Sequence, residues 1–192
     1  MSVWLPLKNP RPDTFPLLNM ALTSACTKGI GTMCAEVMIK WPNDLRHRGA
    51  KLAGILMETQ SDADLGKYLC MGIGVNVNQS DFVHLPQPAT SLKNTTGKEY
   101  NLMDLARALL TQIQTAFAAW EKQPDDNRFL AEFNELLEGK NQYWEAECGA
   151  DEQIQGLLHG VDAQGRILFE TAGKTTALHH GMVRLKTCLT QK

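Results

Sequence analysis

The sequence predicts an α/β (α+β) protein with a small β-barrel at its C-terminus. Two observations carry this prediction. Residues 1–140 combine short apolar runs of strand-like alternation with segments of helical periodicity. After Gly139 the chain changes to closely spaced short apolar runs separated by glycine-containing turns, which is typical of a small all-β barrel. We therefore place a domain boundary near Lys140, with one domain at 1–140 and a second at 141–192.

The elements of the first domain follow from periodicity and from capping and turn residues. Alternation predicts strands at 2–7, 37–41, 52–59 and 68–78, followed by a loop at 79–97. Apolar residues at helical spacing after Thr14 predict a helix that Gly29 ends. Asn101 is expected to cap the clearest helix of the chain, and another helix is expected at about 128–138.

The second domain contains five short apolar runs. They predict strands at 143–148, 154–161, 166–170, 175–179 and 182–185. Turn residues, among them those at 149–151 and 162–165, separate neighbouring runs.

Composition favours a soluble globular protein. Hydrophobic residues make up 43% and charged residues 21%, and the net charge of −2 gives no global field to attract nucleic acid or an anionic membrane. The five cysteines form no C-x-x-C pair, which favours reduced thiols in the cytoplasm over a disulfide framework or a zinc site. No apolar run approaches the length of an export signal or a membrane span, so we expect no membrane association.

The run YLCMGIGVNVN, residues 68–78, separates bulky apolar residues from small and polar ones on the two faces of a strand. On the small face, Gly72 and Gly74 leave bare backbone, and Asn76 follows. Glycine is often placed where a ligand approaches the backbone closely, and Asn76 could bind a purine edge, a phosphate or a metal-bound water. A strand whose glycines make room for a bulky helix residue explains the pattern equally well.

The stretch IKWPNDLRHRGAKLAGILME, residues 39–58, places two lysines around a polar turn. Asn43 and Asp44 favour a turn through bonds from their side chains to the backbone, so a hairpin alone accounts for them. However, Lys40, Asp44 and Lys51 also put two cations and a carboxylate in one small region. Lysine suits phosphate, and a carboxylate beside phosphates suits magnesium. These residues therefore predict a nucleotide site.

Three segments taken together resemble the biotin–protein ligases: K-W-P-N-D at 40–44, K-L-A-G-I-L at 51–56 and G-I-G-V-N-V-N at 72–78. They occur in the family's order with similar gaps, and residues 89–92 look like the segment before the family's long helix. The resemblance implies a partial class II aminoacyl-tRNA synthetase/biotin ligase-like catalytic sheet with helices, followed by an SH3-like β-barrel. Lipoate–protein ligases share this fold but match the three segments less well.

The resemblance also implies a reaction and its residues. Biotin and ATP would condense to biotinyl-5′-adenylate with release of pyrophosphate, and biotin would then pass to a lysine on the biotin-carrier domain of a carboxylase. Lys51 would be the catalytic residue and would bind the biotin carboxylate. The implied biotin-binding glycines are Gly54, Gly72 and Gly74. The implied ATP-binding residues are Lys40, Trp41, Asn43, Asp44, Asn76 and Lys186. Asp44 would also be a weak Mg²⁺ ligand.

The sequence departs from the family in two places. The ligases' loop G-R-G-R-x-G-R is absent from these 192 residues, and the resemblance begins partway through the catalytic domain. We therefore expect weak adenylation by this chain alone, no DNA-binding domain, and an unpaired sheet edge that favours a homo-oligomer or a complementing chain. Near the C-terminus, Met182 stands where the family has an acidic residue after glycine, although Lys186 keeps a cation. The rival interpretation is a non-catalytic paralogue that binds a nucleotide or a partner protein.

Overall fold

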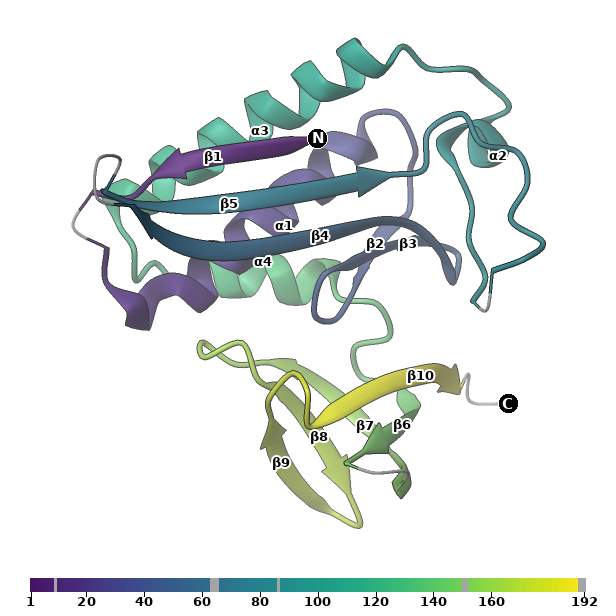
Figure 1. Ribbon diagram of the computed structural model, residues 1–192. Helices are drawn as coiled ribbons and strands as arrows, with labels where there is room; N and C mark the ends of the chain where they lie inside the picture. The colour runs from purple at the N-terminus through teal and green to yellow at the C-terminus, as the bar shows by residue number, and fades with distance from the viewer. Residues whose placement is uncertain (9, 63–65, 86, 150–151, 190–192) are drawn as a thin grey trace.

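The computed structural model describes residues 1–8, 10–62, 66–85, 87–149 and 152–189 (Figure 1). Its elements in chain order are β1 (Ser2–Pro6), η1 (Pro12–Thr14), α1 (Phe15–Gly31), β2 (Val37–Lys40), β3 (Asp44–His47), β4 (Ala50–Asp62), β5 (Gly66–Val75), α2 (Leu92–Thr96), α3 (Leu102–Lys122), α4 (Arg128–Leu136), β6 (Tyr143–Cys148), β7 (Glu152–Val161), β8 (Ile167–Thr171), β9 (Lys174–Leu178) and β10 (Val183–Leu189). The strands form an N-terminal sheet, ordered β1-β5-β4-β3-β2, and a C-terminal sheet, ordered β10-β6-β7-β8-β9. Both sheets are antiparallel throughout.

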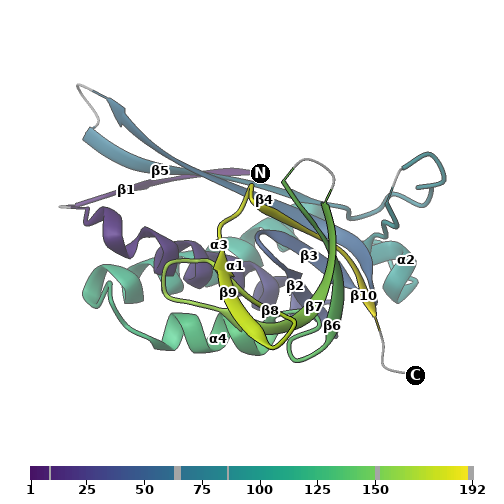
Figure 2. The same ribbon diagram turned by 90° about the horizontal axis from the view of Figure 1, so that it is seen from below.

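The N-terminal sheet is covered by helices on one face only. Figures 1 and 2 show α1, α3 and α4 on the same side of this sheet. Ile55, Met71 and Ile73 point to that side and are at most 4% exposed, and burying such side chains contributes roughly 1.5–3 kcal/mol each. On the opposite face Trp4 and Leu56 are 58% and 60% exposed. Strand alternation therefore separates a core face from an open face, as the sequence of residues 68–78 predicts.

The first and third helices show one error and one success of the sequence analysis. The helix α1 does not end at Gly29 but continues to Gly31. Gly29 allows a close approach to α3, because a Cβ atom there would lie 3.1 Å from Leu109 Cδ2. The helix α3 begins as predicted, since the Asn101 side chain accepts a hydrogen bond of 2.8 Å from the backbone N–H of Met103.

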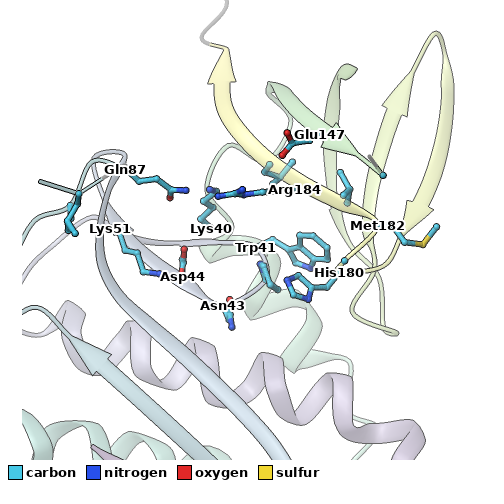
Figure 3. Close-up of a pocket in the computed structure, with 17 residues that line it drawn as sticks. Lys40, Trp41, Asn43, Asp44, Lys51, Gln87, Glu147, His180, Met182 and Arg184 are labelled. Atoms are coloured by element: carbon cyan, nitrogen blue, oxygen red, sulfur yellow. Dashed lines mark ion pairs between the residues drawn. The ribbon is translucent and has the colours of Figure 1, made fainter. Parts of the chain in front are cut away.

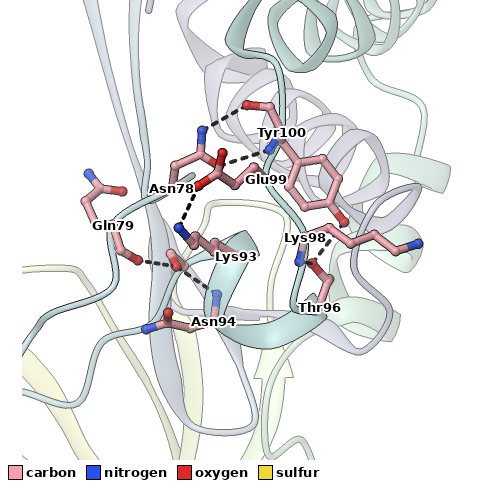
Figure 4. Close-up of polar contacts among 9 residues, drawn as sticks. Asn78, Gln79, Lys93, Asn94, Thr96, Lys98, Glu99 and Tyr100 are labelled. Atoms are coloured by element: carbon pink, nitrogen blue, oxygen red, sulfur yellow. Dashed lines mark hydrogen bonds and ion pairs between the residues drawn. The ribbon is translucent and has the colours of Figure 1, made fainter.

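One strand and one α-helix of the N-terminal half were not predicted. The strand β3 lies inside the segment expected to be a turn, and α2 lies inside the loop expected at 79–97. Figure 4 shows the polar contacts that hold α2 and the residues on either side of it. The Asn78 amide donates to the Tyr100 carbonyl at 2.9 Å and accepts from the Tyr100 N–H at 3.0 Å. The Ser91 hydroxyl, which caps α2, donates to the Gln79 carbonyl at 2.6 Å.

The C-terminal sheet contains the five predicted strands and is consistent with the predicted SH3-like domain, although it is not a closed barrel. Among the described residues, β9 and β10 lie at opposite ends of the strand order and do not pair. The chain leaves β9 through residues 179–182 and returns beside β6, so the sheet stays open. Trp144, fully buried, packs in the core of this sheet. In the predicted turn at 149–151, positions 150 and 151 lie outside the described residues.

Several hydrogen bonds join the C-terminal sheet to the rest of the chain. Trp41 Nε1 donates to the Gly165 carbonyl at 3.1 Å, and the Asn134 amide donates to the Val161 carbonyl at 2.9 Å. The segment between α4 and β6 is in turn held against β2, because the backbone N–H of Glu138 donates to the Ile39 carbonyl at 2.8 Å. These contacts fix the C-terminal sheet beside the β2–β3 end of the N-terminal sheet.

None of the helices in the described ranges combines the length and apolar character needed to cross a bilayer.

Candidate functional site

A cleft of about 670 Å³ lies between the two sheets (Figure 3). Its lining comes from three parts of the chain: the β2–β4 end of the N-terminal sheet, the loop before α2, and β6 with the β9–β10 turn and β10. The charged and polar residues that line it are Lys40, Asn43, Asp44, Lys51, Gln87, Glu147, His180 and Arg184. Three lysine or arginine side chains therefore meet two carboxylates, and the cleft favours an anionic ligand.

A row of four residues crosses the N-terminal sheet at the edge of this cleft. Lys40 pairs with Asp44, Asp44 with Gly54, and Gly54 with Gly74. Residues directly opposite each other in an antiparallel pair share one face of the sheet. The row therefore places a cation, a carboxylate and two positions without side chains next to one another on the open face.

A β-bulge adds Lys51 to this row. Leu45 pairs with Ala53 but Arg46 pairs with Lys51, so β4 holds one extra residue at this point. Regular alternation would turn the Lys51 side chain away from the face of Gly54, because the two positions differ by an odd number. The extra residue buries both Leu52 and Ala53, at 0% and 2% exposure, and returns Lys51 to the open face. Its ammonium lies 2.5 Å from Asp44 Oδ1.

Gly54 makes room for this ion pair. A Cβ atom at position 54 would lie 3.3 Å from Lys51 Nζ and 3.5 Å from Asp44 Oδ1. Gly72 and Gly74 are less crowded, because a Cβ atom at either would approach only a backbone oxygen at 3.9 Å. Neither of them, nor Gly54, lines the cleft itself. The three glycines instead form a strip of bare backbone on the open face that leads away from the Lys51–Asp44 pair.

Lys40 differs sharply from Lys51. Its residue is only 9% exposed, and burial is the main cause that lowers the pKa of its ammonium, with Arg46 as the next cause. Asp44 and Glu138 act in the opposite direction. Lys40 has no hydrogen-bond or ion-pair partner for its ammonium within the described ranges. A buried cation of this kind gains a partner when an anion enters the cleft.

Three other predicted residues use their side chains to hold the structure. Asn43 lines the cleft, and its amide donates to the Ile55 carbonyl at 2.5 Å. Trp41 also lines the cleft while its indole N–H bonds across the sheet junction. Asn76 lies outside the cleft lining, and its amide donates to the Thr90 carbonyl at 3.0 Å.

The loop before α2 contributes residues that sequence reasoning missed. The Lys51 N–H donates to the Pro88 carbonyl at 2.8 Å, and the Thr90 N–H donates to the Lys51 carbonyl at 2.9 Å. The loop therefore runs beside the start of β4, and Gln87 reaches the cleft. The sequence carried no signal for this pairing, because the loop lacks strand-like alternation.

The C-terminal sheet presents a different cation from the one predicted. Lys186 is absent from the cleft lining, and its ammonium lies 2.6 Å from Glu147 Oε2. The hydrogen bond from Lys186 is the main cause that lowers the pKa of Glu147. Arg184, two residues earlier, lines the cleft. A register shift between Leu185 and Thr187 falls on Lys186 and separates the two side chains.

The described residues contain no group of three or more His, Cys, Asp or Glu side chains that could hold a metal by themselves. Asp44 therefore fits a magnesium ion only together with oxygens of a bound nucleotide. This is the usual arrangement for Mg²⁺, which takes one or two protein carboxylates plus substrate phosphates.

Comparisons with known proteins point to one family. A family model described as the biotin/lipoate A/B protein ligase family matches residues 1–76. The biotin–[acetyl-CoA-carboxylase] ligase of Mycobacterium tuberculosis is 29% identical over 149 residues, which cover 78% of this chain and 53% of that protein. The bifunctional ligase/repressor BirA of Bacillus subtilis is 30% identical over 179 residues, covering 88% of this chain and 54% of that protein. The chain thus spans about half the length of these two relatives.

Solved structures show the same fold. The biotin protein ligase from Aquifex aeolicus in complex with biotin and ATP superposes with a TM-score of 0.79 at 23% identity, over 96% of this chain and 76% of that one. The apo structure of the Aquifex aeolicus ligase gives a TM-score of 0.78 at 22% identity, over 96% and 80% of the two chains. The predicted α/β fold of a biotin ligase is therefore confirmed, with a C-terminal sheet that is consistent with an SH3-like domain.

Proposed function

We propose that this chain, which belongs to the biotin/lipoate A/B protein ligase family, carries the adenylate-forming site of an ATP-dependent biotin–protein ligase. A carboxylate oxygen of biotin attacks the α-phosphorus of ATP, the bond from that phosphorus to the bridging oxygen breaks, and pyrophosphate leaves. The amine of a carrier lysine then attacks the acyl carbon, AMP leaves, and the amine loses a proton to solvent. In this proposal residues 1–140 form the catalytic domain and 141–192 an SH3-like domain.

The observation that carries this proposal is the position of Lys51. Its ammonium is held between Asp44 and the bare backbone of Gly54, at the edge of a cleft that also contains Lys40. A biotin carboxylate approaching over the glycine strip would meet this charge where the new oxygen–phosphorus bond forms. Preorganised charge at such a point contributes about 3–4 kcal/mol to a transition state.

The remaining predicted residues take supporting roles in the proposal. Lys40 binds ATP phosphates, and Asp44 would hold magnesium together with oxygens of the bound nucleotide. The metal would neutralise phosphate charge. Trp41 and Asn43 shape the ATP side, Gly72 and Gly74 leave space for biotin, and Asn76 fixes the loop that pairs with Lys51.

The partner in this proposal is the biotin-carrier domain of a carboxylase, the class of protein that the names of the relatives identify. We also propose a cytoplasmic location. All five cysteines have free thiols, which agrees with a reducing compartment. The homo-oligomer or complementing chain and the weak activity of residues 1–192 alone stay predictions, and the assay below measures the second of them.

Biotin-dependent exchange of pyrophosphate into ATP tests the proposed function. We expect Lys51→Ala to lower the exchange rate by about a hundredfold or more, because the charge at the reacting centre is lost. Lys67→Ala, on the exposed start of β5, is the matched control and should leave the rate unchanged. Lipoate in place of biotin tests the lipoate-ligase alternative.

Equal exchange rates for wild type and Lys51→Ala would contradict the assignment of Lys51. ATP binding without any biotin-dependent exchange, from a correctly folded chain, would instead support the non-catalytic paralogue.

A further inference from the structure

Arg46 and Glu138 form a largely buried ion pair close to the cleft. The Arg46 Nη1 atom lies 3.1 Å from Glu138 Oε2, and the two side chains are only 13% and 17% exposed. Neither residue lines the cleft itself. Because both charges lose most of their hydration, a pair of this kind adds little net stability. A role in fixing the local geometry accounts for it better.

Glu138 ties three segments of the chain together. Its backbone N–H donates to the Ile39 carbonyl of β2 at 2.8 Å, and its carboxylate binds Arg46 of β3. Since β2 is the edge strand of the N-terminal sheet and lies between β3 and the segment after α4, the ion pair spans β2. The strands that carry Lys40 and Asp44 are thereby joined to the segment that leads into the C-terminal sheet.

Arg46 lies among the site residues on the open face of the N-terminal sheet. It follows Asp44 by two residues on β3, so the two side chains share this face. It is directly opposite Lys51 at the β-bulge of β4. On β2 it is opposite Met38, two residues before Lys40, so Lys40 is its diagonal neighbour. An anchored Arg46 therefore restrains the strands that carry both lysines.

The two charges of this pair also act on Lys40, in opposite directions. Burial is the main cause that lowers the pKa of Lys40, and Arg46 is the next cause, whereas Glu138 raises it. With the ion pair intact, the two charges partly offset each other at the Lys40 ammonium. The charged groups that face Lys40 are Asp44 and Arg46 on β3, Glu138 after α4, and Arg184 on β10, which itself lies opposite Glu147 on β6.

We propose that Arg46 and Glu138 are positioning residues that hold Lys40 in place at the cleft, with Glu138 as the carboxylate that offsets the charge of Arg46. The proposal rests on the proposed function for the part that Lys40 plays in the reaction. Neither residue of the pair touches a substrate, because the pair acts through β2 and β3 and through its own two charges. The segment after α4 therefore serves the site as well as linking the two sheets.

An NMR titration of the ligand-free full chain with isotope-labelled lysine side chains tests the charge effect. The signal that Lys40→Met removes belongs to Lys40. We expect Glu138→Gln, which keeps the size and an acceptor, to lower the titration midpoint of Lys40 by about one pH unit, and Arg46→Gln to raise it similarly. General loosening of the fold would not move the midpoint in opposite directions. Glu36→Gln, in the exposed Arg48–Glu36 pair, is the matched control and should leave the midpoint unchanged.

Amide hydrogen exchange tests the effect on position. In Glu138→Gln the charge-assisted bond to Arg46 is lost, and we expect the amide of residue 138, which bonds to Ile39, to exchange about tenfold faster. Arg46→Lys, which keeps the cation, should exchange more slowly at this amide than Arg46→Gln. Glu36→Gln should exchange as wild type does.

Unchanged midpoints of Lys40 in correctly folded Glu138→Gln and Arg46→Gln, or midpoints that move in the same direction, would overturn the proposal. Wild-type exchange at the amide of residue 138 in both variants would overturn it as well. Failure of the proposed function gives a different result. If biotin-dependent exchange is absent but the midpoints and the amide exchange change as expected, the proposed reaction fails and the positioning role stands.

Discussion

The two walls of the cleft are built in different ways. In the N-terminal wall, Lys40 and Asp44 are close in sequence and lie opposite each other on neighbouring strands, and Gly54 continues their register row beside the cleft. In the C-terminal wall, the position of Arg184 depends on how a separate sheet packs against the first one. The nearby Lys186 forms an ion pair with Glu147. Strand pairing therefore keeps the residues of a short motif next to one another. In a site shared between two sheets, by contrast, the residue that reaches the cleft can be a different one from the residue that the motif predicts.

Replacing Lys40 should have the largest effect on the N-terminal wall. We expect Lys40→Met to weaken tripolyphosphate binding by about tenfold to a hundredfold, yet to raise the free energy of unfolding of the ligand-free chain by about 1 kcal/mol, because an unpaired buried charge is removed. The measurements are calorimetric titration and thermal melting, with Lys67→Met as the control. Weaker binding combined with lower stability would show that Lys40 serves the fold instead.

Lys40→Met should also change how the free energy of unfolding depends on pH. Because the pKa of Lys40 lies below that of an exposed lysine, the unfolded chain binds more protons between the two pKa values. The free energy of unfolding should therefore rise with pH through that window. Lys40→Met should flatten this rise, which melting curves at increasing alkaline pH can measure.

Gly54→Ala tests a position next to the N-terminal wall, where the glycine makes room for the Lys51–Asp44 ion pair. The new methyl group would lie 3.3 Å from Lys51 Nζ, so the ammonium must shift, and we expect biotin-dependent exchange to fall by about tenfold because misplaced charge stabilises the transition state less. Gly31→Ala, where nothing lies within 4 Å of the added Cβ, is the control. An unchanged rate of exchange in Gly54→Ala would show that the reaction does not depend on the exact position of the Lys51 ammonium.

Trp41→Phe tests the junction between the walls and has the smallest expected effect. It removes the hydrogen bond to the Gly165 carbonyl, and we expect the free energy of unfolding to fall by about 1 kcal/mol more than in Trp120→Phe. The comparison is matched, because both tryptophans are buried but Trp120 Nε1 has no acceptor in the described structure. Urea unfolding measures both variants, and equal losses would mean that the bond adds nothing.

The local parts of this fold could be predicted from the sequence. Alternation located most strands, and Asn101 marked the start of α3 through a cap that the structure contains. The predictions were wrong where tertiary contacts determine whether a helix forms and where it ends. Gly29 continues α1 because α3 packs against it, and α2 forms in a loop that side chains such as Asn78 hold in place.

The residues of the site also fall into two groups, those that could be predicted from the sequence and those that could not. The grouping of Lys40, Asp44 and Lys51 follows from short spacing on adjacent strands, and the structure brings all three to the cleft. Arg184 and Gln87 could not be found this way, because their positions depend on sheet docking and on loop pairing. Nor could alternation show that Lys186 faces Glu147, since a register shift in β10 falls on that residue.

The bulge in β4 gives the spacing K-x-x-G a meaning beyond sequence identity. Lys51 and Gly54 are an odd number of residues apart and share a face only because the strand is irregular between them. Anyone transplanting this lysine–glycine arrangement into another protein must therefore carry over the irregularity as well. On an ideal strand the same four letters would bury the lysine and leave the glycine alone at the surface.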